Sequence, residues 1–98
     1  MSITSQTNNN VVTIHIVGSF DYKMRTEFRK AYADKPPGTP FEIDFSRVSS
    51  VDSSALGMLL VLREQCGGDQ ANIALINCKP EIRHLFQISQ FKDLFHLR

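Results

Sequence analysis

The 98-residue sequence contains no tryptophan, two cysteines, five glycines and four prolines. Cys66 and Cys78 stand twelve positions apart and form no CxxC pair, whereas a disulfide framework or a zinc site usually needs more ligands at closer spacing. We therefore predict two reduced cysteines, no metal site and no cofactor. The sequence also lacks a surplus of charge, since 11 basic and 10 acidic residues leave a net charge of +1. A near-neutral chain without a basic cluster is a poor candidate for nucleic-acid binding.

Long hydrophobic runs are missing as well. The longest apolar stretch, 55–62, is far shorter than the roughly 20 residues that span a bilayer. The first ten residues, MSITSQTNNN, have no basic start and no apolar segment typical of a secretory signal. We therefore expect a cytoplasmic protein that does not insert directly into a membrane, built as a single domain over residues 1–98.

The residues that are present predict alternating strands and helices. Two-residue periodicity indicates strands at 11–17 and 41–45, a weaker strand candidate lies at 3–6, and 72–76 reads as a further strand. Asn8-Asn9-Asn10 is typical of a hairpin turn between the first two strands. Helices are predicted from a cap at Asp21, over 53–65, and from Pro80. The segment 91–97 reads as a short helical turn or a last edge strand.

The alternating strands have one polar face each, unlike the continuous apolar strands of a sheet covered on both sides. The sequence thus predicts an α/β fold with a mixed sheet of four to five strands and helices mainly on one face. If the strands at 11–17 and 41–45 pair, His15 should lie on the polar face near Glu42 and Asp44.

The segment 52–60, DSSALGMLL, carries the clearest functional signal. Asp52 or Ser53 caps the helix, and the free amides of its first turn would stabilise an anion such as a phosphate on Ser53. The helix is apolar all round: Leu56, Leu59 and Leu60 can face the sheet, which leaves Met58, Val61 or Leu62 pointing outward. Either neighbouring helices cover these outward residues, or they form a partner surface beside Ser53.

Nucleophilic catalysis by Ser53 is not indicated. The sequence has no Gly-x-Ser-x-Gly elbow and no phosphate-binding loop, and its pattern places none of the three histidines near Ser53.

Three motifs together resemble a stand-alone STAS domain of the anti-sigma factor antagonist type. Gly18-Ser19-Phe20-Asp21 resembles the family's step from a strand to the first helix. The segment from Phe45 to Gly57, with Asp52-Ser53-Ser54-Ala55-Leu56-Gly57 at its end, resembles the family's phosphorylation segment. The segment from Cys78 to Ser89 resembles its third helix and the turn that follows. Ala55 stands where many relatives have glycine, a change that a helix tolerates.

The resemblance implies a STAS-like fold and a regulatory role without enzymatic activity. It implies that Ser53 is the phosphoacceptor, with Ser54 as second choice, and that Asp21 and Asp52 flank the site. With the outward residues of the second helix, the predicted partner-binding set is Asp21, Asp52, Ser53, Ser54, Met58 and Val61.

The implied partners are an anti-sigma factor with a GHKL-type serine kinase fold and a PP2C-type serine phosphatase. The unphosphorylated protein would bind the anti-sigma factor and free the sigma factor for transcription, and phosphorylation would end that binding. Two alternatives stay open: an accessory STAS subunit that docks on the ATPase of a membrane transporter, and a STAS binding module for another signalling enzyme.

Overall fold

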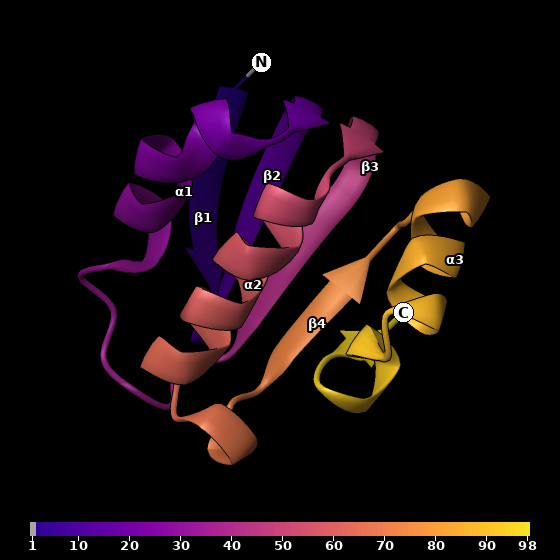
Figure 1. Ribbon diagram of the computed structural model, residues 1–98. Helices are drawn as coiled ribbons and strands as arrows, with labels where there is room; N and C mark the ends of the chain where they lie inside the picture. Colours follow the sequence, from indigo (N-terminus) through magenta and orange to yellow (C-terminus); the bar gives the residue numbers. More distant parts are fainter. Residues whose placement is uncertain (1) are drawn as a thin grey trace.

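The computed structural model describes residues 2–98 and contains one five-stranded sheet with three α-helices (Figure 1). The strands lie in the order β1-β2-β3-β4-β5; β1 is antiparallel to β2 and every other neighbouring pair is parallel. This confirms the predicted mixed α/β sheet. The elements are β1 (Ser2–Asn8), β2 (Val11–Phe20), α1 (Arg25–Tyr32), β3 (Phe41–Val51), α2 (Ser53–Gln65), β4 (Ile73–Ile76), α3 (Pro80–Ile88) and β5 (His96–Leu97).

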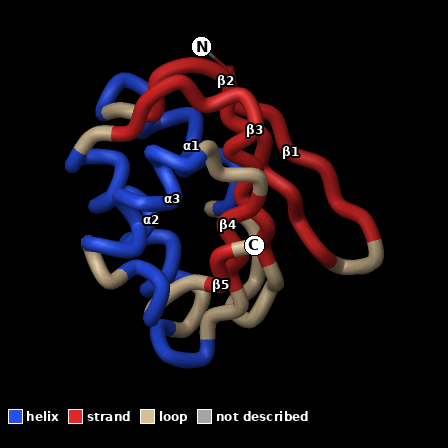
Figure 2. Tube along the Cα trace, turned by 90° about the vertical axis from the view of Figure 1, so that its right-hand side faces the viewer, coloured by secondary structure: helices blue, strands red, loops and turns tan. Residues whose placement is uncertain are grey.

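All three α-helices pack on the same face of the sheet (Figure 2). The alternation of the strands explains why: Ile14, Ile43 and Leu75 are fully buried on the helix side. The opposite face carries polar side chains, and no helix of residues 2–98 covers it. There the Nδ1 atom of His15 lies 2.8 Å from Oδ2 of Asp44, as the sequence predicted for paired strands.

The first two strands are joined by the predicted asparagine turn. Asn9 and Asn10 adopt left-handed backbone angles, with φ of 54° and 67°, and asparagine tolerates this conformation better than most residues. The turn fixes the antiparallel register, in which Asn8 pairs with Val11 and Ser2 with Val17.

Strands β2 and β3 extend further than the sequence pattern predicts. The pattern ends the two predicted strands at residues 17 and 45, whereas the structure continues β2 through residues 18–20 and β3 through residues 46–51. The register shifts twice. Between the pairs His15–Asp44 and Val17–Arg47, β3 advances by three residues while β2 advances by two. Between the pairs Gly18–Val48 and Ser19–Ser50, β3 advances by two residues while β2 advances by one. Each shift places one extra residue in β3, which interrupts the alternation that strand prediction depends on.

The first helix also begins differently from the prediction. The Asp21 carboxylate accepts a hydrogen bond from the Lys23 amide (2.9 Å) and caps a 3-10 turn, Tyr22–Met24, and α1 starts only after that turn. At the other end of the chain, both expected structures are present in succession, as a 3-10 turn at Phe91–Asp93 and strand β5.

A chain of aromatic rings joins the helices to the sheet. Phe45 on β3 contacts Phe20 and Phe86, with ring centroids 6.0 and 5.3 Å apart. Phe86 on α3 stacks on Phe91, which stacks on Phe95. These rings connect the last third of the chain to the centre of the sheet and so hold α3 in place.

Candidate functional site

The carboxyl ends of β2 and β3 bring two acidic residues to one end of the sheet. Phe20 and Val51 are paired in register, so Asp21 and Asp52 each follow directly on neighbouring strands. The amide of Asp52 also donates to the carbonyl oxygen of Phe20 (3.4 Å). The structure thus places the two predicted flanking residues at the point where α2 begins.

Asp52 is the N-cap of α2. Its Oδ1 accepts hydrogen bonds from the Ser54 hydroxyl (2.6 Å) and from the Ala55 amide (3.0 Å). These bonds, that from Ser54 first, hold the pKa of Asp52 below its usual value, so the carboxylate is ionised at neutral pH. The cap satisfies one of the free amides of the helix start and fixes the direction of the chain at the serine pair.

Ser53 and Ser54 differ in their surroundings. Ser53 is the first residue of α2, its side chain is exposed, and its hydroxyl forms no hydrogen bond to any part of the chain between residues 2 and 98. Ser54 is half-buried and its hydroxyl is bound to Asp52. Of the two hydroxyls, that of Ser53 is therefore the more accessible to a modifying enzyme.

The outward face of α2 differs in part from the prediction. Leu62 is fully buried and Met58 is 8% exposed, whereas Leu60, expected to face the sheet, is 38% exposed. The physical reason is that Ala55, Leu59 and Leu62 make the contact with the sheet, and this rotates Leu60 toward solvent. Val61 is 50% exposed, as the sequence predicted.

Helices α1 and α2 lie side by side (Figure 1). A groove of about 540 Å³ lies between them. Met58 and Val61, both predicted to contact a partner, line it together with Ser54. Sequence reasoning missed the contribution of α1, because only the packing of α1 beside α2 brings the two sets together; the α1 side of the groove consists of Tyr22, Arg25, Phe28, Arg29 and Tyr32.

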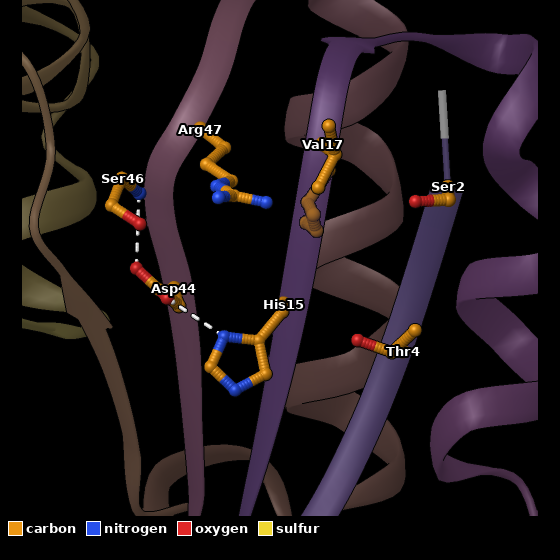
Figure 3. Close-up of a pocket in the computed structure, with 8 residues that line it drawn as sticks. Ser2, Thr4, His15, Val17, Asp44, Ser46 and Arg47 are labelled. Atoms are coloured by element: carbon orange, nitrogen blue, oxygen red, sulfur yellow. Dashed lines mark hydrogen bonds and ion pairs between the residues drawn. The ribbon is translucent and has the colours of Figure 1, made fainter.

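A smaller hollow of about 340 Å³ lies on the uncovered face of the sheet (Figure 3). Asp44 is its centre: its carboxylate accepts from the Ser46 amide (3.0 Å) and the Asn77 side chain (3.1 Å), besides its contact with His15. Burial opposes ionisation of Asp44, but these hydrogen bonds outweigh it and lower its pKa to about 2. Ser46 lies within the first register shift and has no partner residue on β2. By accepting the hydrogen bond from the Ser46 amide, Asp44 stabilises this shift.

The histidines and cysteines are the other residues whose side chains could take part in chemistry. His15 is bound to Asp44, and none of the three histidines forms a hydrogen bond to Ser53 within the described chain. Cys66 and Cys78 are both unpaired thiols, and burial raises the pKa of Cys78 to about 11. Residues 2–98 contain no group of three or more His, Cys, Asp or Glu side chains placed to hold a metal ion.

None of the helices described between residues 2 and 98 combines the length and the apolar character needed to cross a membrane.

A mixed sheet with helices on one face, and a capped helix that begins with a serine pair at the end of β3, define a STAS-type domain. Solved structures of this class superimpose well. An anti-sigma factor antagonist from Mycobacterium paratuberculosis has a TM-score of 0.81 at 20% identity, over 98% of this chain and 83% of that chain. The Bacillus cell fate determinant SpoIIAA in its phosphorylated form has a TM-score of 0.68 at 21% identity, over 99% and 91%. A sulfate transporter family protein from Wolinella succinogenes has a TM-score of 0.72 at 14% identity, over 92% and 79%.

At these identities the structural likeness concerns the fold, and the sequence comparisons establish the family. Residues 3–97 match the STAS_2 family, whose description is "Mlab, STAS domain". A STAS-domain containing protein of Pseudomonas aeruginosa (strain UCBPP-PA14) is 42% identical over 101 residues, covering 99% of both chains. The chain therefore belongs to the STAS domain family.

Proposed function

We propose that this STAS domain is an anti-sigma factor antagonist controlled by phosphorylation of Ser53. The observation that carries the proposal is the exposed hydroxyl of Ser53 at the start of α2, which forms no hydrogen bond within residues 2–98. Ser53 directly follows the cap Asp52 and precedes Ser54, which lines the α1–α2 groove. In its unphosphorylated form the domain binds an anti-sigma factor with a GHKL-type serine kinase fold and releases the sigma factor. It acts as substrate and switch, with no catalytic step of its own.

The modification is an ordinary phosphoryl transfer by the partner. The Oγ atom of Ser53 forms a bond to the γ-phosphorus of ATP held by the kinase, the bond from that phosphorus to ADP breaks, and the hydroxyl proton passes to a base of the kinase. A PP2C-type phosphatase reverses the step by hydrolysis, which returns the serine hydroxyl and releases inorganic phosphate.

Phosphorylation would end binding by charge and desolvation. A phosphoserine adds about −1.5 to −2 charges at neutral pH. At the helix start this charge gains about 0.3–1 kcal/mol from the free amides. In the interface it would add to the negative charge of the Asp21 and Asp52 carboxylates, and burying it there should cost several kcal/mol. A net loss of about 4 kcal/mol corresponds to a roughly 10³-fold weaker complex.

Affinity purification of wild type, Ser53→Ala and Ser53→Asp, with identification of the partner by mass spectrometry, tests the proposal. We expect wild type and Ser53→Ala to retain a kinase-type anti-sigma factor and Ser53→Asp to lose it by about two to three orders of magnitude in affinity. Ser54→Ala is the matched control and should leave the switch intact. Equal recovery of the partner by Ser53→Ala and Ser53→Asp would refute the switch, and phosphopeptide mapping to Ser54 would move the site.

A second candidate is an accessory subunit docked on the ATPase of a membrane transporter. The similarity in fold to a sulfate transporter family protein supports it. The same purification separates the two candidates, because a transporter ATPase would then be recovered in place of a kinase-type anti-sigma factor, and by all three variants alike.

A further inference from the structure

The groove between α1 and α2 has the length and the lining of a binding site for a helix. On α2 its residues recur at helical spacing from Ser54 to Gln65, a distance of about 16 Å at 1.5 Å per residue. On α1 and the preceding 3-10 turn, Tyr22, Arg25 and Tyr32 line the facing wall. The groove therefore covers about three helical turns and starts beside Ser53.

The buried part of the groove is apolar, and so are two of the exposed side chains beside it. Phe28 and Met58 form its buried part, with exposures of 1% and 8%. Tyr22 and Val61 stand on opposite sides and are 60% and 50% exposed. Large apolar side chains so exposed on both sides of one groove are typical of a surface that a partner covers.

Among the described residues that line the groove, two carry a charge, and both are arginines. Neither Arg25 nor Arg29 forms an ion pair with an acidic residue within the part of the chain that the structure describes. The guanidinium of Arg25 lies over the Tyr22 ring, 4.7 Å from its centroid. Burial raises the pKa of Tyr32, and the positive charge of nearby Arg29 partly opposes this rise. The guanidinium groups are thus held at the groove and free to pair with carboxylates.

Gly57 keeps the groove open at its centre. It lies inside α2, where glycine is the least favourable residue apart from proline, yet its φ is not in the left-handed region. A Cβ atom added there would meet no atom within 4 Å, so neither the backbone nor the packing requires glycine. Gly57 lines the groove, so its missing side chain leaves open space on the α2 wall.

We propose that the groove receives an amphipathic helix of a protein partner, with an apolar side chain over Gly57 and acidic side chains on the flank that faces Arg25 and Arg29. For the identity of that partner the inference rests on the proposed function, since the groove continues from the surface around Ser53. The recognition itself depends only on the groove: apolar anchors spaced three to four residues apart fill it, and paired charges set the orientation.

Titration of the ¹⁵N-labelled domain with two synthetic helical peptides tests the inference. Both peptides are 16 residues long with leucine at positions i, i+3, i+4 and i+7; one carries glutamate on its polar flanks and the other lysine. We expect the glutamate peptide to shift the amides of Tyr22, Arg25, Gly57 and Val61, and to bind at least tenfold more tightly than the lysine peptide. Gly57→Gln should weaken binding about tenfold, and the double variant Arg25→Glu/Arg29→Glu should reverse the preference between the peptides.

Two control variants make the result specific to the groove. Lys30→Glu makes the same kind of charge reversal on an exposed position of α1 outside the groove, and Glu64→Gln places the same glutamine on an exposed position of α2. Both should bind the glutamate peptide like wild type. Equal affinity for the two peptides, shifts elsewhere on the domain, or tight binding of dodecanoate that displaces the peptide would overturn the inference. Because no kinase or phosphate is present, a failure of the Ser53 switch would leave this result unchanged, and the reverse also holds.

Discussion

Ser53 and Ser54 are adjacent in the sequence, but their hydroxyl groups have different surroundings. The Ser54 hydroxyl donates to Asp52 at 2.6 Å, so its modification would first break a hydrogen bond of the helix cap. The Ser53 side chain is exposed, and its modification breaks no contact within the described chain. Under the proposed function, the Asp52 carboxylate would thus assign Ser54 to the helix cap and leave Ser53 for regulation.

Asp44 leads to a prediction about pH. Its pKa of about 2 lies below the ordinary 3.8, so the ionised carboxylate stabilises the fold above about pH 4, and this stabilisation is lost as the pH falls through 2. Asp44→Asn should lower the free energy of unfolding at pH 7 by about 1–2 kcal/mol. The difference from wild type should shrink as the pH approaches 2, as measured by urea unfolding followed by circular dichroism.

The control for this prediction is Asp34→Asn. Asp34 is 79% exposed and, within residues 2–98, its one ion pair is with its neighbour Lys35 at 3.7 Å, so its replacement should change stability little at any pH. If the difference in the free energy of unfolding between Asp44→Asn and wild type does not change from pH 7 to 2.5, the hydrogen bonds to the ionised Asp44 do not stabilise the fold.

At the scale of the elements, Gly57 makes helix α2 less stable than alanine at this position would. Since a Cβ there meets nothing within 4 Å and the backbone is helical, Gly57→Ala should raise the free energy of unfolding by about 0.5–1 kcal/mol. The midpoint of urea unfolding measures the gain. Gly67→Ala is the opposite case, because Gly67 has φ of +108°, and this variant should be destabilised. A loss of stability in Gly57→Ala would mean that the glycine serves the fold after all.

The elements also show what the sequence can and cannot predict. The bounds of α2 follow from Asp52 as cap and from the apolar stretch after it, both of which are local. The ends of β2 and β3 do not, because the register shifts break the alternation and depend on how the two strands pair. The candidate phosphorylation site is a local motif and could be predicted, whereas the groove needs α1 beside α2, a long-range relation that one helix pattern does not contain.

At the scale of the whole molecule, phosphorylation should change the charge and not the fold. The net charge of +1 would become roughly −1 with one phosphate. Ser53 is exposed and lies outside the aromatic core, so we expect the free energies of unfolding of the phosphorylated protein and of Ser53→Asp to stay within about 1 kcal/mol of wild type. Thermal and urea unfolding measure this, and amide shifts should be confined to the start of α2 and its neighbours. Loss of the native spectrum in either form would contradict a switch by repulsion.

The order of the strands has a consequence for how the domain is made. The sheet reads β1-β2-β3-β4-β5 in space as along the chain, so each strand pairs first with the one just before it. As the chain leaves the ribosome, every new strand finds its neighbour already synthesised, and no later segment has to insert between two formed ones. Each crossover closes a loop of a few tens of residues, for which the entropic cost rises only slowly with length. Assembly can therefore proceed from the hairpin outward during synthesis, one strand at a time.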